Sequence, residues 1–209
     1  NTAMPTAEQD SILRSYRALC GVRSPWEQRW ESLRHYVLPS RLPESSLAQP
    51  DGEQHPHALR DTTAVEACQK LAGGHMSYIT PSSELWFKWE SPDPAASDEV
   101  NAWYNRCSEI ANRELGLSNF YTELHECFLD RVGLGTGSLY CGSTRSGRLL
   151  FRHIPCGRFV CAENDEGVTD TYMREFTFTP HQALCRFGKR ALGQQALSLA
   201  ADARHEHSG

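Results

Sequence analysis

The sequence predicts an α+β fold in which amphipathic helices come first and an antiparallel β meander follows. Apolar residues recur at helical spacing as far as about residue 133, and between 138 and 179 their period changes to two. The strand segments follow one another without helices between them, which argues against an alternating α/β arrangement. We therefore expect one α+β region with helices over 6–133, strands over 138–179 and further short helices over 180–204.

The composition indicates a globular protein without strong affinity for nucleic acid. Of the 209 residues, 39% are hydrophobic and 22% are charged, and the formal net charge is −5. Proteins that grip DNA usually carry an excess of Lys and Arg, so any contact with nucleic acid should be loose. We find neither a signal peptide nor an apolar run of ~20 residues, and we interpret the eight cysteines as reduced thiols.

Two capping boxes mark helix starts near the N-terminus. The first is Thr6-Ala7-Glu8-Gln9, and its helix should end near Gly21. The second is Ser24-Pro25-Trp26-Glu27, with proline at the first helical position, and its helix should end before Pro39. The Pro-, Ser- and Gly-rich segment 40–58 is expected to be a long surface loop.

The remaining elements follow from capping residues, glycines and changes of period. Helices are expected over 63–78, from Ser97 to Gly116, from Ser118 or Asn119 to the glycines after 132, and from Thr179 towards Gly188. Strands are expected at 84–90, 138–141, 148–154, 158–163 and 168–179.

The glycine run GLGTG at 133–137 resembles a phosphate-binding loop but has the wrong order of elements. A dinucleotide fingerprint needs a strand before the glycines and a helix after them, so that the helix N-terminus faces the phosphates. Here a helix precedes the glycines, and its C-terminus carries partial negative charge. We interpret the run as a helix stop followed by a turn into a strand.

Other candidates for chemistry are weaker. His153, Cys156, Cys161 and Cys185 lie at spacings on the margin of structural zinc sites, and ordinary strand and helix positions explain them better. No nucleophile elbow and no zincin motif occurs. We interpret the carboxylates of the helix before the glycine run, Glu123, Glu126 and Asp130, as a solvated face. We assign no catalytic, cofactor-binding or metal-binding residue.

Aromatic residues recur at helix and strand spacing along the first 121 residues. They could form a stacking platform for bases, but this spacing favours the core or a contact between subunits. They are Trp26, Trp30, Trp86, Phe87, Trp89, Trp103, Tyr104, Phe120 and Tyr121.

The order of several motifs resembles the head-to-tail connecting (portal) proteins of short-tailed bacteriophages and prophages. The similar stretches are WESLRHYVLPSR (30–41) and those at 60–90, 117–141 and 151–188. The residues that carry the resemblance, to which it gives structural roles, are Asp61, Thr62, Ala64, Trp86, Phe87, Ser118, Asn119, Phe120, Gly135, Thr136, Gly137, Arg174 and Glu175.

The resemblance implies a structural protein without enzymatic activity and without a cofactor. It implies a ring, usually of twelve subunits, at one capsid vertex, through which the terminase motor pumps DNA. The expected partners are further copies of the chain, the terminase, capsid or scaffold proteins, tail proteins and loosely held double-stranded DNA, with no membrane. The expected location is the virion and, during assembly, the host cytoplasm.

Family members are much longer than 209 residues, so the resemblance also implies the N-terminal, wing part of a portal chain or a degenerate prophage gene. Two alternatives remain open from the residues themselves. One is a metal- or nucleotide-dependent enzyme, and the other is a nucleic-acid-binding module built on the aromatic residues.

Overall fold

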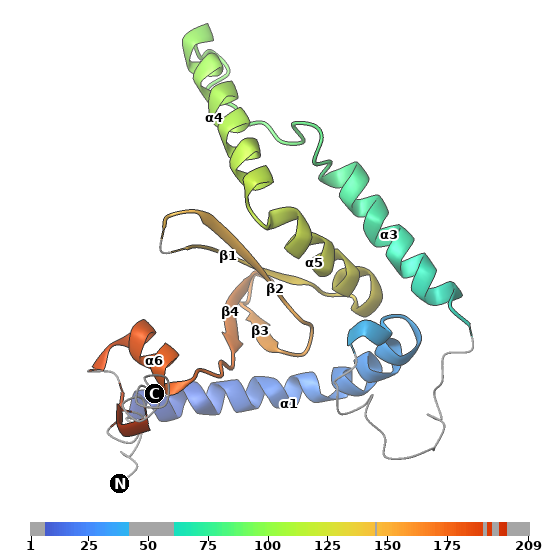
Figure 1. Ribbon diagram of the computed structural model, residues 1–209, viewed down its shortest axis with the longest axis vertical. Coiled ribbons are helices and arrows are strands. Elements are labelled where there is room, and N and C mark those ends of the chain that lie inside the picture. Colours follow the sequence, from blue (N-terminus) through green and yellow to red (C-terminus); the bar gives the residue numbers. More distant parts are fainter. Residues whose placement is uncertain (1–6, 42–60, 145, 190–191, 194–196, 200–209) are drawn as a thin grey trace, which may run out of the picture. The chain divides into compact units, whose positions relative to one another are not determined.

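The computed structural model describes residues 7–41, 61–144, 146–189, 192–193 and 197–199. Its helices are α1 (Ala7–Tyr36), the short 3-10 helix η1 (Pro39–Arg41), α3 (Thr63–Ile79), α4 (Asp98–Leu117), α5 (Phe120–Leu134) and α6 (Pro180–Phe187). Its strands are β1 (Ser138–Ser143), β2 (Leu149–Ile154), β3 (Phe159–Glu163) and β4 (Thr169–Arg174) (Figure 1). The predicted α+β class is confirmed. Among the described helices, none is both long and apolar enough to span a bilayer.

Contacts between Cα atoms divide the chain into two compact units, which we describe separately. The larger unit covers residues 24–158 and contains the C-terminal part of α1 together with α3, α4, α5 and the β1–β2 hairpin. Within it, α5 packs against α3 on one side and against β2 on another. An apolar cluster of Leu38, Cys68, Leu134 and Cys156 lies beneath these elements.

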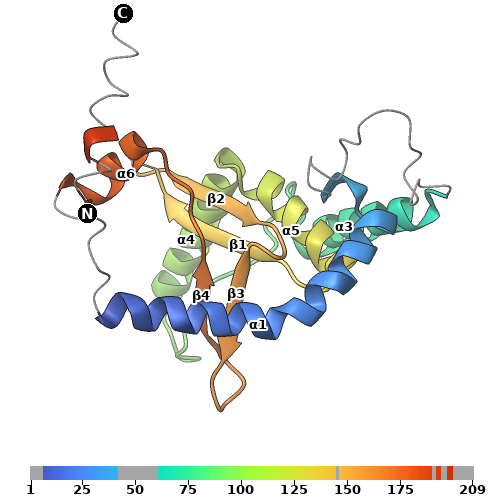
Figure 2. The same cartoon turned by 90° about the horizontal axis from the view of Figure 1, so that it is seen from below.

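The smaller unit covers residues 1–23 and 159–209, and its sheet is the β3–β4 hairpin (Figure 2). Val160 is buried, and the ring of Phe159 stacks on Tyr172 across the hairpin at 5.2 Å between centroids. After β4 the chain reaches α6, where Thr179 and Gln182 form a reciprocal capping box and Gly188 follows the last turn. The predicted start and end of this helix are confirmed.

The four strands form two separate antiparallel hairpins instead of one continuous meander. The pairs are β1 with β2 and β3 with β4, and β4 ends at Arg174, earlier than the alternating pattern to 179 predicts. The meander is interrupted because the edge of β2 that faces away from β1 is bound by side chains of α5, as described below.

The first helix does not stop at Gly21, and the prediction of a second helix from Ser24 is wrong. α1 runs without interruption from Ala7 to Tyr36 with Pro25 inside it. A proline within a helix lacks an N–H, and its ring presses on the carbonyl four residues earlier. That earlier residue is Gly21, whose missing side chain lets the backbone adjust. The box at Thr6 and most of the expected loop, residues 42–58, lie outside the described residues.

The expected strand at 84–90 does not form. Residues 85–90 are neither helix nor strand, and the amide of Trp89 donates to the Ser108 hydroxyl at 2.8 Å. Its aromatic side chains pack instead: Trp86 stacks on Phe120 and donates its indole N–H to the Tyr121 hydroxyl. Aromatic content alone therefore produced a false strand signal.

The glycine run joins α5 to β1, as the order of elements predicts. Gly135 ends α5 in the left-handed region with φ of 88°, and its N–H donates to the Arg131 carbonyl. A Cβ atom on Gly137 would lie 2.5 Å from the backbone oxygen of Cys127. One glycine is therefore required by its dihedral angle and the other by close approach.

We expect Gly137→Ala to lower the free energy of unfolding by about 1–3 kcal/mol, because backbone must move to admit the methyl group. Gly135→Ala should cost about 1–2 kcal/mol through the left-handed conformation. Gly74→Ala is the matched control, since a Cβ there meets no atom within 4 Å. It should stabilise α3 by about 0.5–1 kcal/mol. Urea unfolding followed by circular dichroism measures all three, and ATP binding that disappears in either destabilised variant would contradict the interpretation as a joint.

Candidate functional site

A row of polar side chains runs along one face of α5. Asn119, at its N-cap, and Glu123, Glu126 and Asp130 follow at intervals of four, three and four residues. These intervals place them above one another on the same side of the helix. The row lies against β2 and η1, and each of its members makes a hydrogen bond to one of those elements or to the turn after β2.

The first two members of the row take the place of a neighbouring strand. The Asn119 amide donates to the Phe151 carbonyl at 2.8 Å and accepts from the Phe151 N–H at 2.9 Å. Glu123 accepts from the N–H of His153 at 2.6 Å. The backbone edge of β2 that β1 leaves open is thus satisfied by helix side chains, which prevents it from pairing with another strand.

Asp130 lies at the other end of the row and is completely buried. One carboxylate oxygen accepts from Nε of Arg41 at 2.9 Å. The other accepts from the Cys156 N–H and from Nε2 of the His153 ring, both at 2.9 Å. Because an ionised carboxylate only accepts, His153 must carry its proton on Nε2 here. One side chain therefore joins η1, β2 and the turn that follows β2.

Arg41 completes the group from η1. Its second contact is with Glu126, whose carboxylate accepts from the guanidinium at 2.5 Å. A guanidinium between two carboxylates matches its several N–H donors to acceptors in fixed directions. The group therefore neutralises a buried charge and holds η1 onto α5.

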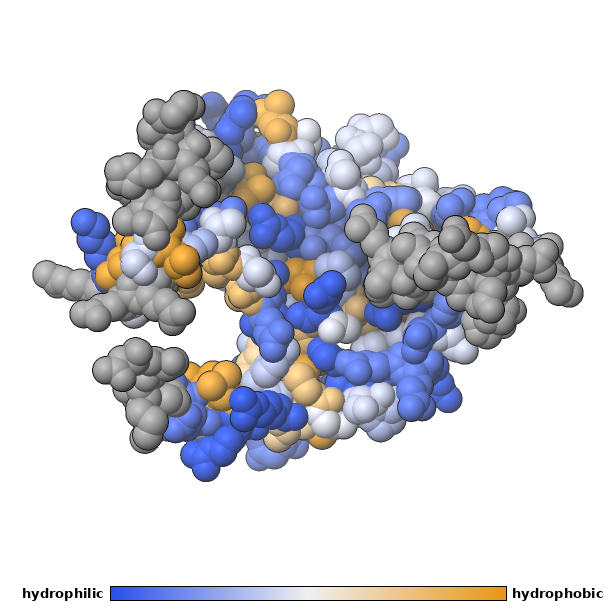
Figure 3. Space-filling view, turned by 60° about the horizontal axis from the view of Figure 1, so that its bottom comes forward, coloured by the Kyte–Doolittle hydropathy of each residue, from blue (hydrophilic) through white to orange (hydrophobic). Residues whose placement is uncertain are grey.

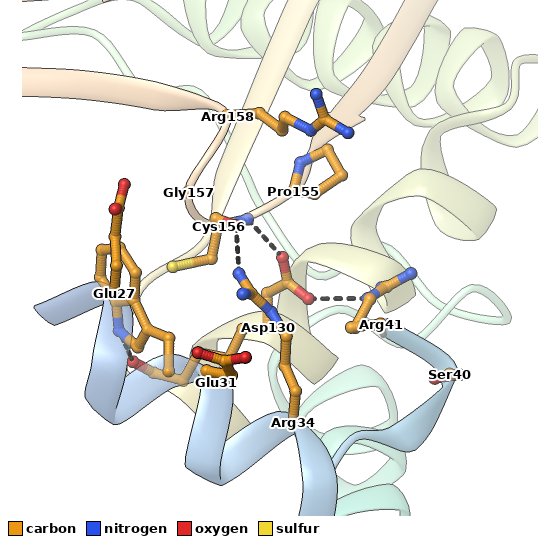
Figure 4. Close-up of a pocket in the computed structure, with 12 residues that line it drawn as sticks. Glu27, Glu31, Arg34, Ser40, Arg41, Asp130, Pro155, Cys156, Gly157 and Arg158 are labelled. Carbon is orange, nitrogen blue, oxygen red and sulfur yellow. Dashed lines mark hydrogen bonds and ion pairs between the residues drawn. The ribbon is translucent and has the colours of Figure 1, made fainter. Parts of the chain in front are cut away.

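Two side chains of α1 extend this arrangement to the turn after β2 (Figure 4). The Arg34 guanidinium donates to the Cys156 carbonyl at 2.7 Å. The indole N–H of Trp30 donates to the Leu134 carbonyl at 3.1 Å, at the C-terminus of α5. These residues, with Glu27, Glu31 and Arg158, line a cavity of about 600 Å³. Its charges are mixed, so it does not select a ligand of one sign.

The surroundings of Asp130 set the pKa values nearby. Burial alone raises the pKa of Asp130, but the hydrogen bonds from His153 and Cys156 and the charge of Arg41 outweigh it, so the pKa lies below the ordinary value. Burial lowers the pKa of Arg41, and the two carboxylates more than compensate, so its pKa is raised. Burial, aided by the Asp130 charge, raises the pKa of the Cys68 and Cys127 thiols, which keeps both protonated.

The group around Asp130 holds η1, β2 and the turn after β2 together, and its geometry does not fit a catalytic centre. An Asp–His pair also occurs in catalytic triads, where the imidazole must reach a nucleophile beside the substrate. The His153 side chain is only 6% exposed, so a substrate cannot approach it. Within the ranges that the structure describes, no three His, Cys, Asp or Glu side chains gather closely enough to hold a metal ion. Cys156 belongs to the apolar cluster, and His181 and Cys185 lie 3.8 Å apart on the exposed face of α6.

Comparison with known proteins identifies the family of the chain. The family described as bacteriophage head to tail connecting protein matches residues 9–208. This chain belongs to that family. It is 27% identical over 189 residues to the portal protein of Salmonella phage epsilon15, covering 88% of this chain and 34% of the relative. It is 25% identical over 194 residues to a protein named as a probable portal protein of Bordetella phage BPP-1, covering 92% and 35%. The chain thus spans about a third of the length of these curated relatives.

The motif residues that suggested the connector family lie in four places, three of them in the larger unit. Asp61 accepts from the N–H and hydroxyl of Thr63 at the start of α3, and the adjacent Thr62 donates to Glu66. The aromatic motif residues meet around Phe120, while Ser118 and Asn119 fix the start of α5. Gly135, Thr136 and Gly137 form the joint to β1. Ala64 is exposed on α3.

The last two motif residues, Arg174 and Glu175, lie in the smaller unit of the connector chain. The Arg174 guanidinium lies over the ring of Phe176 at 3.9 Å from its centroid. Phe176 and Phe178 stack in turn, at 5.6 Å between centroids, just before α6. Arg174 is thus the last residue of β4, and Glu175 begins the link to α6.

The interpretation of Glu123, Glu126 and Asp130 as a solvated face is wrong. Asp130 is buried, and the other two bind β2 and η1. A row of carboxylates on a helix is ordinarily interpreted as solvent-exposed unless its partners are known. Here the partner Arg41 lies 89 residues away from Asp130 in the sequence, so the sequence did not indicate it. The spacing of the row carried no signal of burial, because a polar helix face ordinarily faces solvent.

We expect Asp130→Asn to lower the free energy of unfolding at neutral pH by about 3–5 kcal/mol. Arg41 would lose the buried one of its two carboxylate partners, and the new amide N–H group would face donors that now bind the Asp130 carboxylate. The native pKa of Asp130 is depressed, so its contribution is complete above the unfolded value of about 3.9 and disappears as pH falls through the lower native value. Urea unfolding over a pH series should show a flatter acid limb in this variant.

The exposed Asp165→Asn substitution is the matched control and should leave both quantities nearly unchanged. If the free energy of unfolding of Asp130→Asn fell at acid pH as steeply as that of the unmodified protein, the stability of this group would not depend on an ionised Asp130.

Proposed function

We propose that this chain is the wing part of a phage portal subunit and acts by assembly with further copies. The match to the connector family over residues 9–208 carries the proposal. The assembled ring, of about twelve subunits by family resemblance, would occupy one capsid vertex and admit and release the genome. The single α+β region would then be one part of a longer subunit, and the motif residues would serve its fold.

The chemistry of the chain supports a structural function. The most elaborate polar group, around Asp130, fixes helices to a strand and is closed to substrates. The net charge of −5 suits a wall along which DNA slides, since a basic surface would hold phosphates and slow the passage. We propose the terminase motor, capsid or scaffold proteins and tail proteins as the other partners, with assembly in the host cytoplasm and a final location in the virion.

The surface of the described residues also supports assembly. Eleven hydrophobic residues are buried in them, whereas 21 large hydrophobic residues are exposed. Figure 3 shows such apolar side chains reaching the surface between hydrophilic ones. Single exposed apolar residues are ordinary, but a surplus of this size over the core indicates surface that another protein covers.

Electron microscopy and native mass spectrometry of the complete gene product test the proposal. We expect closed rings of one subunit number, with a mass that is a whole multiple of the subunit mass. A product that stays monomeric at every concentration would refute the proposal. Filter binding to double-stranded DNA over a salt series should show only weak affinity, and tight binding with a steep salt dependence would favour the nucleic-acid-binding alternative.

A further inference from the structure

Helix α4 carries an apolar stripe on the side that faces away from its own chain. Its inner side holds Ser108, the one buried residue of this 20-residue helix. On the outer side Trp103, Ile110 and Leu117 recur every seven residues and are 61%, 43% and 64% exposed. Arg106 and Arg113 alternate with them and complete a pattern of three- and four-residue steps. These steps keep the five side chains on one side of the helix, where a second helix can pack along them.

Helix α3 carries a second stripe with the same steps. Ala64, Ala67, Leu71, Gly74 and Tyr78 follow at intervals of three, four, three and four residues. Leu71 is 53% exposed and Tyr78 is 90% exposed, while the buried residues Cys68 and Ala72 face α5. The α3 stripe is rich in small residues, and the α4 stripe consists of large ones, so their surfaces are complementary in size.

The paired glycines of α3 point to a close neighbour. Glycine inside a helix costs stability, and it is retained where another backbone or a bulky side chain must come close. A Cβ atom on Gly73 or Gly74 would meet nothing within 4 Å in its own chain. The described part of the chain thus gives no packing reason for these glycines, whereas a large side chain from a second copy does.

We propose that the α3 stripe of one copy packs antiparallel against the α4 stripe of a second copy, with Leu71 opposite Ile110. This register places an apolar pair at each end and a small residue opposite each arginine. The resulting layers are Ala64–Leu117, Ala67–Arg113, Leu71–Ile110, Gly74–Arg106 and Tyr78–Trp103. The two arginines and Leu117 of α4 thus lie opposite the small residues of α3, and Ile110 and Trp103 lie opposite its two large ones.

Charge complementarity sets the relative direction of the two helices. Glu66 and Lys70 border one edge of the α3 stripe. Glu109 borders the corresponding edge of the α4 stripe, and Arg113 is the stripe residue next to that edge. Antiparallel packing brings these edges together and places Glu66 beside Arg113 and Lys70 beside Glu109. Parallel packing would place the two edges on opposite sides of the seam. Both edges are exposed, and the short-range pairs of Glu66 with Thr62 and of Arg113 with Glu114 lie at the surface, where they can exchange.

The contact is heterologous, because each copy offers α3 to one neighbour and α4 to the other. Contacts of this type form rings when their rotation closes and open filaments when it does not, whereas a contact between two α4 stripes would stop at a dimer. The inference rests on the proposed function in that it names the surfaces by which portal subunits would meet in the wing.

Complementary variants of this chain test the contact. Leu71→Asp disables the α3 stripe, and Ile110→Asp disables the α4 stripe. In analytical ultracentrifugation the unmodified chain should associate with rising concentration, and each variant alone should lose at least tenfold in association constant. An equimolar mixture of the two should form one-to-one dimers and nothing larger, because a single intact junction remains. Gln69→Asp on α3 and Asn101→Asp on α4 are exposed controls that should associate normally, and circular dichroism checks that all variants fold.

A charge exchange avoids the core of the contact. Glu66→Arg should weaken association at least threefold, and adding Arg113→Glu to the same chain should restore it. Association of either aspartate variant alone, or a mixture that gives no dimers, would overturn the inference. The same holds for an unmodified chain that stays monomeric up to about 1 mM. Rings of the complete gene product that are unaffected by Leu71→Asp and Ile110→Asp would remove the inference and leave the proposed function, whereas the absence of rings would remove the proposed function itself.

Discussion

The larger unit depends on one buried carboxylate. Asp130 is completely buried, yet it stays ionised because Arg41, His153 and the Cys156 amide all donate to it. A buried charge without partners is strongly unfavourable, so the three donors must arrive together for the carboxylate to be tolerated. The same requirement couples η1, β2 and the turn after β2, because none can leave without exposing the others to an unbalanced charge.

That coupling explains how a two-stranded sheet is stable in this unit. An isolated hairpin is marginal in water, and the open edge of β2 would invite pairing with another strand. Asn119 and Glu123 bind that edge from α5, so the helix acts as the third strand without adopting its conformation. This arrangement keeps the β1–β2 sheet from pairing with another strand at its open edge.

The elements whose signals are local could be predicted from the sequence. The structure confirms the predicted starts of α3, α4, α5 and α6, and it confirms that α5 and α6 end at glycines. α4 continues through Gly116, the predicted stop, to Leu117. One error is local, and the others depend on contacts between residues that are distant in the sequence. Pro25 is tolerated within α1 beside Gly21, and the strand signal of Trp86 and its neighbours was in fact an aromatic cluster with Phe120. The role of Asp130 depends on Arg41 and His153, which the chain brings to it from both directions.

The core is small and the two stripes are exposed because α3 and α4 bury few of their residues. Few positions of α3 and α4 contribute to the core: the buried residues are Cys68 and Ala72 in α3 and Ser108 in α4. The opposite sides of these helices are still apolar, with Leu71, Tyr78, Trp103 and Ile110 in water. A monomer gains nothing from such positions, and the paired glycines of α3 lower its stability. Covering the two faces, as in the contact proposed above, would lower the free energy of the folded chain.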